Sequence, residues 1–183
     1  MLKLMYITNS PEVASIADGA GVDRIFIDLE QYGKEKRQKN WDSVKSKHSI
    51  SDIPKVKAAV KNAQIFVRTD PIFDGFSDEL EGVLACEPDV VMLPYFKTVR
   101  EVETFIKAVD GRATTSLLLE TREAAEQIDD IISVGGIDEI HIGLNDLSHS
   151  YGKKFLFEEL ADGTVDRLSL IHISEPTRLD VIS

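Results

Sequence analysis

Short runs of β-branched and apolar residues alternate along this chain with amphipathic stretches of helical periodicity, and this order constrains the fold more than any other feature. Strands that alternate with helices predict a parallel sheet, because parallel strands need a long crossover connection between them. Strands are expected at residues 4–7, 24–29, 64–68, 90–95, 116–120 and 139–144. Helices are expected at residues 11–20, 53–61, 77–84, 99–109 and 122–134.

The residues after the strands favour a closed barrel over an open doubly wound sheet, although both fit this order of elements. Polar residues cluster just beyond five strands, at 28–31, 68–70, 95–97, 120–122 and 145–146. Barrels carry their active sites at this C-terminal face. We therefore expect an α/β fold of the (β/α)8 TIM-barrel type, incomplete at about six βα units, because 183 residues fall short of the roughly 250 typical of a whole barrel. The longest connection, residues 31–51, is expected on the same face as a lid or binding loop.

Charge and cysteine content exclude several classes of protein. The formal net charge of -11 disfavours binding to nucleic acid or to anionic lipid. The apolar run at residues 1–7 is too short for a signal peptide or a membrane span, so no membrane association is expected. Cys86 is the only cysteine, which excludes an intramolecular disulfide and fits a reducing cytoplasm. We therefore expect a cytoplasmic protein without nucleic-acid or membrane partners.

Four strand ends carry a resemblance to a known family, and residues 92–94 add to it. These strand ends are the segments 25–30, 66–68, 118–124 and 142–148. Their order and spacing, over most of residues 1–152, resemble those of the HpcH/HpaI aldolase/citrate lyase family. The resemblance implies a barrel of the phosphoenolpyruvate/pyruvate type. It also implies a divalent-metal-dependent carbon–carbon lyase that cleaves a hydroxy-oxo acid or related carboxylate through a metal-stabilised enolate.

The same resemblance assigns roles to individual residues. Glu120 and Asp146 would bind Mg²⁺ or Mn²⁺, which suits two carboxylates at the ends of adjacent parallel strands. Arg68 would contact the oxygen atoms of an oxo acid or carboxylate substrate. The other substrate-binding candidates are Glu30, Gln31 and Asn145. A homo-oligomer is expected for a full-length protein.

Structural alternatives to these roles remain open. Glu120 would then cap the following helix and Asp146 the following turn, a common role for acidic residues at strand ends. Arg68 would form an ion pair with Glu30 at the rim of the barrel.

The sequence also departs from the family pattern. Gln31 replaces a His that the aldolases pair with an Asp, and the position of that Asp falls near Ala85. Because Gln31 cannot exchange a proton at neutral pH, metal-bound water or another residue would have to protonate the enolate. The candidates are His149, Lys97 and Lys34, of which His149 is expected on a loop, where it could equally be a solvated surface group. Leu118 stands where the aldolases place a Gln, so the substrate is expected to differ from theirs.

The end of the chain differs in character from the rest. Residues 168–178 resemble a translated sequencing-library adapter, so we expect a partial family domain at 1–167 and a non-native tail at 168–183. The tail is expected to pack poorly and to lack a partner strand. The alternative is a genuine seventh strand at residues 168–173, where the sequence alternates well.

Two other functional hypotheses compete with the lyase. One is a catalytically silent barrel that binds a metal or ligand, which the missing His favours. The other is a truncated fragment without function, because a barrel of six units exposes sheet edges and apolar helix faces. Metal-dependent release of pyruvate or a similar product would separate an enzyme from a silent binding protein.

Overall fold

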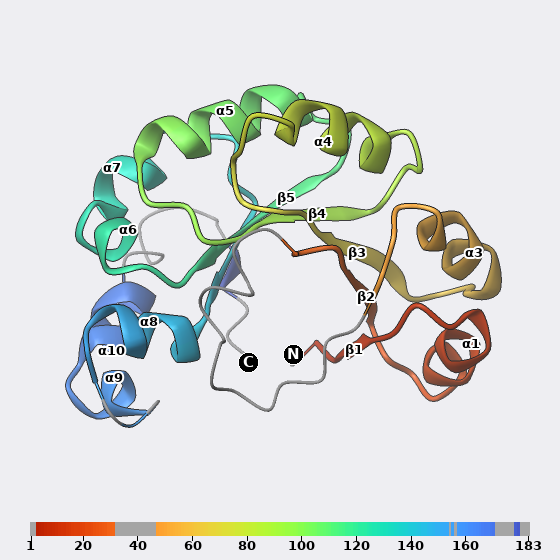
Figure 1. Cartoon of the computed structure of the whole chain (residues 1–183). Coiled ribbons are helices and arrows are strands. Elements are labelled where there is room, and N and C mark those ends of the chain that lie inside the picture. Colours follow the sequence, from red (N-terminus) through yellow and green to blue (C-terminus); the bar gives the residue numbers. More distant parts are fainter. Residues whose placement is uncertain (1–2, 32–46, 154, 156, 171–177, 180–183) are drawn as a thin grey trace. The chain divides into compact units, whose positions relative to one another are not determined.

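The computed structural model describes residues 3–31, 47–153, 155, 157–170 and 178–179. The chain forms two compact units, Met1–Met92 and Leu93–Ser183, and each is described by itself. Both units are built from strands that alternate with helices, as the colour order in Figure 1 shows.

The first unit contains βα repeats whose strands pair in parallel. Strands β1 to β4 follow one another in the sheet, and the pairs β1–β2, β2–β3 and β3–β4 are all parallel. Its elements are β1 (Met5–Ile7), α1 (Pro11–Gly19), β2 (Arg24–Asp28), α3 (Asp52–Ala59), β3 (Gln64–Arg68), α4 (Phe76–Leu84) and β4 (Val90–Leu93). Helices α1 and α3 lie side by side, and they contact β2 and β3 respectively (Figure 1).

The second unit repeats this arrangement, with β5 and β6 parallel and in register from Ser116 opposite Glu139 to Leu119 opposite Ile142. Its elements are α5 (Val99–Val109), β5 (Thr114–Leu119), α6 (Arg122–Glu126), α7 (Ile128–Ile132), β6 (Glu139–Ile142), α8 (Leu144–Ser150), α9 (Glu158–Ala161), α10 (Thr164–Leu170) and β7 (Arg178–Leu179).

The predicted elements agree closely with the observed ones. The limits of β3 and α5 were predicted without error, and those of the other predicted strands and of α1, α3 and α4 differ by one or two residues. The expected parallel pairing is confirmed for the strand pairs described within each unit. Strands β4 and β6 are buried along their whole length, as expected for strands covered on both faces.

The prediction of one continuous helix at residues 122–134 is wrong, because the segment is divided into α6 and α7 at Gln127. The side-chain amide of Gln127 donates hydrogen bonds to the carbonyl oxygens of Lys97 and Glu123, at 3.2 and 3.0 Å. The backbone of Gln127 has φ −108° and ψ 17°, outside the helical range. A contact with a distant segment therefore accompanies the break, and this contact has no local sequence signal.

The expectation that residues 168–183 lack a partner strand is wrong for Arg178 and Leu179. These two residues pair in parallel with Glu139 and Ile140 of β6. An edge strand presents unpaired backbone groups with which any extended segment can pair, which accounts for so short a strand. Leu168 is also buried, at 2% exposure, so the tail does not pack poorly throughout. The part of the predicted seventh strand beyond residue 170 lies outside the described residues.

None of the helices among the described residues combines the length and apolar character needed to cross a membrane. The proposed lid, residues 31–51, lies outside the described residues except at its two ends.

Candidate active site

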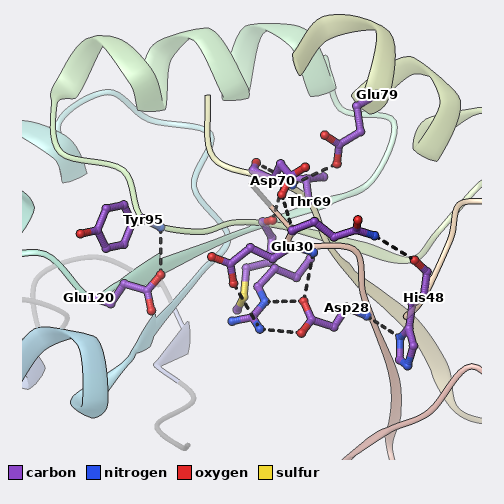
Figure 2. Close-up of polar contacts among 11 residues, drawn as sticks. Asp28, Glu30, His48, Thr69, Asp70, Glu79, Tyr95 and Glu120 are labelled. Carbon is purple, nitrogen blue, oxygen red and sulfur yellow. Dashed lines mark hydrogen bonds and ion pairs between the residues drawn. The ribbon is translucent and has the colours of Figure 1, made fainter. Parts of the chain in front are cut away.

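Glu120 follows directly after β5 and is buried, with 5% of its surface exposed. Its Oε1 accepts a hydrogen bond of 3.0 Å from the backbone N–H of Tyr95, which follows β4 (Figure 2). The N-cap of α6 is Thr121, whose hydroxyl accepts a hydrogen bond from the N–H of Ala124. The alternative in which Glu120 caps this helix is therefore wrong. A carboxylate is instead held inside the unit at the C-terminal end of a strand.

Asp146 lies on helix α8 rather than on a loop, so the expected loop position of Asp146 and His149 is wrong. It occupies the first turn of α8 and is partly buried, and the partial positive charge of a helix N-terminus favours a carboxylate there. The structural role considered for Asp146 thus stays open. Its neighbour Asn145 is also partly buried, whereas His149 is exposed in the last turn.

The ends of β5 and β6 bring Glu120 close to the turn that leads to Asp146. Leu119 pairs with Ile142, and the N–H of Gly143 donates a hydrogen bond of 3.0 Å to the carbonyl oxygen of Leu119. The side chain of Glu120 lies against Gly143, three residues before Asp146. That the two carboxylates converge on one cation remains a prediction.

Among the described residues, no group of three or more His, Cys, Asp or Glu side chains could hold a metal ion. The predicted metal ligands in the second unit are the two carboxylates of Glu120 and Asp146. Oxygen donors suit Mg²⁺ or Mn²⁺, and Mg²⁺ usually binds through one or two carboxylates while it keeps several water ligands. The chemistry of the donor set therefore fits the expected divalent cation.

Arg68 lies at the end of β3 in the first unit and forms a bidentate ion pair with Asp28. Its Nε and a terminal nitrogen donate to the two carboxylate oxygens of Asp28, at 2.9 and 2.8 Å (Figure 2). The same terminal nitrogen lies 3.4 Å from Oε2 of Glu30. The ion pair between Arg68 and Glu30, which was the structural alternative for Arg68, is therefore confirmed. Sequence reasoning missed Asp28, although it pairs with Arg68 in the register of β2 and β3. The contact of Arg68 with a substrate stays a prediction.

Gln31 begins a chain of hydrogen bonds in the first unit that sequence reasoning also missed. Its N–H donates to Oδ1 of Asp70 at 2.6 Å, and the N–H of Asp70 donates to Oε1 of Glu79 at 3.0 Å. Burial, together with the negative charge of Asp70, raises the pKa of Glu79 to about 7, although the hydrogen bond from the N–H of Asp70 lowers it. The side-chain amide of Gln31 donates to the carbonyl oxygen of His48 at 3.4 Å. Glu79 and His48 lie far from Gln31 in the sequence, and no local motif indicated them.

His48 is buried, at 4% exposure, and its Nδ1 accepts a hydrogen bond of 2.9 Å from the backbone N–H of Asp28 (Figure 2). When neutral, the imidazole therefore carries its proton on Nε2.

The three candidates for proton transfer differ in their surroundings. Nζ of Lys97 lies 3.1 Å from Oε1 of Glu123, and this hydrogen bond raises the pKa of Lys97 above its ordinary value. Lys97 therefore stays protonated at neutral pH, where it cannot act as a general base. His149 is exposed, and Lys34 lies outside the described residues.

Leu118, the second departure from the family pattern, is 6% exposed and packs beside Gly143 at the end of β5. It adds an apolar side chain next to the candidate metal ligand Glu120.

Solved structures similar to this chain define its class of fold as an incomplete (β/α)8 barrel. The citrate synthase SbnG is 17% identical, with a TM-score of 0.78 over 100% of this chain and 77% of that one. An HpcH/HpaI aldolase/citrate lyase family protein from Burkholderia cenocepacia is 13% identical, with a TM-score of 0.79 over 100% of this chain and 79% of that one. The citrate lyase beta subunit from M. tuberculosis, complexed with oxaloacetate and magnesium, is 18% identical, with a TM-score of 0.64 over 98% and 77%.

The family itself follows from the sequence, since residues 3–162 match the HpcH/HpaI aldolase/citrate lyase family. The chain therefore belongs to this family, and the carbon–carbon lyases that the family is named for indicate its kind of chemistry. A comparison with curated proteins gives no match.

Proposed function

We propose that this protein is a divalent-metal-dependent carbon–carbon lyase that cleaves a hydroxy-oxo acid to an oxo acid such as pyruvate and an aldehyde. The observation that carries the proposal is the buried carboxylate of Glu120 at the end of β5, beside the turn that leads to Asp146. Oε1 of this carboxylate accepts the N–H of Tyr95, and the C-terminal ends of barrel strands are where folds of this type carry their active sites. Membership in the aldolase/citrate lyase family supports the same chemistry.

Glu120 and Asp146 would hold Mg²⁺ or Mn²⁺ in this proposal. When bound, the cation supplies Lewis-acid polarisation of the keto oxygen of the substrate. The complex of the M. tuberculosis citrate lyase beta subunit with oxaloacetate and magnesium supports a metal and an oxo acid here. Arg68 would contact the carboxylate of the substrate through its guanidinium, with Glu30, Gln31 and Asn145 as further polar contacts.

Cleavage of this kind requires two proton transfers. The hydroxyl on C4 loses its proton as the C3–C4 bond breaks, the electron pair of that bond remains with the C3 fragment, and C3 then takes up a proton. Gln31 can perform neither transfer. The ammonium group of Lys97 can donate the second proton, and His149 can serve in either step when its ring is in the appropriate state.

Neutralising either candidate ligand tests the proposal. We expect Glu120→Gln and Asp146→Asn to lower the metal-dependent rate of pyruvate release from 4-hydroxy-2-oxo acids by about a hundredfold or more, because each removes one charged oxygen ligand. Pyruvate release is measured in a coupled assay with lactate dehydrogenase, in the presence of Mg²⁺ or Mn²⁺ and of EDTA.

Asp130→Asn is the matched control, because it removes one negative charge from an exposed position of α7 in the same unit. This control should keep the parent rate. Parent-like rates in the Glu120 and Asp146 variants would show that the ligand assignment is wrong. Binding of Mn²⁺ by a parent protein that releases no pyruvate from any hydroxy-oxo acid would favour the catalytically silent barrel instead.

A further inference from the structure

Tyr95 has a backbone conformation that is rare for its residue type. Its φ is +49°, in the left-handed region that residues other than Gly, Asn and Asp seldom adopt. Conformations of this kind persist only where the surrounding structure determines them, and they cluster at functional sites. Tyr95 lies two residues beyond β4, at the C-terminal end of the strand.

Contacts on both sides hold Tyr95 in this conformation. On the N-terminal side, the ring of Pro94 fixes the φ of Pro94 itself. After it, the hydroxyl of Thr121 donates a hydrogen bond of 2.7 Å to the carbonyl oxygen of Phe96, and Thr121 is 1% exposed. The carbonyl oxygen of Lys97 accepts a further hydrogen bond of 3.2 Å from the side chain of Gln127. The segment after Tyr95 is thus tied to the residues that follow β5.

The N–H of this strained residue points at Glu120. This N–H lies 3.0 Å from Oε1 of Glu120, and the acceptor is a carboxylate in a buried position (Figure 2). A hydrogen bond from a backbone N–H to a carboxylate is stronger than one between neutral groups. One oxygen of Glu120 is therefore held by the backbone.

Gly143 leaves space for the other oxygen. A Cβ atom at this position would lie 2.9 Å from both Cβ and Oε2 of Glu120, and 3.3 Å from Cδ1 of Leu118. The backbone of Gly143, at φ −84° and ψ 86°, does not itself require glycine. The requirement comes from Glu120, whose Cβ and Oε2 both lie too close to the position that a side chain at residue 143 would take.

We infer that Tyr95 and Gly143 are positioning residues that fix the Glu120 carboxylate as a one-oxygen cation ligand, with Oε1 bound to the Tyr95 N–H and Oε2 presented to the cation. Oε2 lies against Gly143, which precedes the second proposed ligand, Asp146, by three residues in the chain. This inference rests on the proposed function, because it takes Glu120 as a metal ligand. Residues that contact a metal-binding side chain in this way hold it in the orientation that the cation needs.

The first test substitutes Gly143. We expect Gly143→Ala to weaken Mn²⁺ binding by about tenfold or more, because the new methyl group displaces the carboxylate of Glu120. Gly19→Ala is the matched control, since a Cβ at Gly19 meets no atom within 4 Å and Gly19 lies in the first unit. Mn²⁺ affinity is measured by titration with electron paramagnetic resonance detection of free Mn²⁺, and circular dichroism verifies that each variant is folded.

The second test compares two substitutions of Tyr95 that both remove the aromatic ring. Asn tolerates a positive φ, whereas the β-branched side chain of Val strongly disfavours it. We expect Tyr95→Asn to bind Mn²⁺ within about twofold of the parent and Tyr95→Val to bind it about tenfold more weakly. Loss of the ring cannot explain this difference, because both variants lack it.

The outcomes separate this inference from the proposed function. Parent-like Mn²⁺ affinity in both Gly143→Ala and Tyr95→Val would overturn the inference alone. If Gly143→Ala does not fold, the comparison of Tyr95→Asn with Tyr95→Val decides the question. A parent protein that binds Mn²⁺ without any lyase activity would overturn the proposed function, while the affinities of the variants would still decide the inference. A parent that does not bind Mn²⁺ would overturn both.

Discussion

Arg68 at the end of β3 and Glu120 at the end of β5 are charged residues whose surroundings differ. The guanidinium of Arg68 contacts two carboxylates, those of Asp28 and Glu30, which are each 7% exposed. One guanidinium thus pairs with two carboxylates in the first unit. The pairing orients Arg68 through Asp28, since a bidentate contact fixes the plane of the guanidinium. A residue first considered for substrate contact therefore also has a structural role in the first unit.

Glu79 gives a prediction at the scale of a single residue, because burial raises its pKa to about 7. An acid with a raised pKa binds its proton more tightly in the folded state than in the unfolded state. The stability contributed by the protonated Glu79 is therefore fully present below the unfolded pKa of about 4.5, and it is lost as the pH rises through 7. Gln cannot ionise, and its amide oxygen can still accept the N–H of Asp70.

We expect Glu79→Gln to raise the free energy of unfolding at pH 8 by about 1 kcal/mol, less than the full pKa change would give, because solvent screens a partly exposed carboxylate. Near pH 4.5 the variant and the parent should be equally stable. Urea denaturation at the two pH values measures both differences. An equal effect at pH 4.5 and pH 8 would show that ionisation of Glu79 is not the cause.

At the scale of elements, α5 shows why some limits could be predicted without error. Thr98 and Glu101 form a capping box, in which the Thr98 hydroxyl accepts from the N–H of Glu101 at 3.3 Å and the Glu101 carboxylate accepts from the N–H of Thr98 at 2.8 Å. At the other end Asp110 adopts the left-handed conformation, with φ 49°, that commonly terminates helices. Both signals lie within a few residues of the helix, so the sequence carries them directly.

The capping box gives the second prediction of this section. Thr98→Ala should lower the free energy of unfolding by about 1 kcal/mol, because the N–H of Glu101 loses its side-chain acceptor. Thr104→Ala is the matched control in the same helix. Thr104 is exposed, and its hydroxyl donates to the carbonyl oxygen of Arg100, so its replacement should be neutral or slightly stabilising. Equal losses in the two variants, measured by thermal unfolding, would rule out a specific effect of the cap.

At the scale of the whole chain, the last residues provide a test of which segments belong to the fold. The family match ends at residue 162, whereas Val165 and Leu168 of α10 are buried, at 8% and 2% exposure. Strand β7 has only two residues and pairs with β6 alone among the described strands. We propose that residues 168–183 are a non-native tail whose first residues continue α10, which packs Leu168 within the second unit.

Shortening the chain tests this proposal. Deletion of residues 171–183 should change the midpoint of thermal unfolding little, because a two-residue strand buries little surface. Leu168→Ala should lower the free energy of unfolding by about 2 to 3 kcal/mol, because it leaves a cavity at a buried position. A large loss of stability on deletion would show instead that β7 is a genuine part of the fold.

The sequence by itself determined the six strands β1 to β6 and the helices α1, α3, α4 and α5, with limits to within two residues, and the location of Glu120 at the end of a buried strand. Each of these properties depends on neighbouring residues, through hydrophobic periodicity, helix caps and turns, so a local pattern is sufficient to predict it. The family resemblance adds the proposal that Glu120 and Asp146, on the same local segments, are metal ligands.

Only the tertiary structure decided the ion pair of Arg68 with Asp28, the raised pKa of Glu79, the break at Gln127 and the positive φ of Tyr95. These features arise from groups far apart along the chain, such as the 40 residues between Asp28 and Arg68 or the 25 between Tyr95 and Glu120. The free energy of such contacts depends on burial and distance in the folded state, which periodicity and local propensity do not encode.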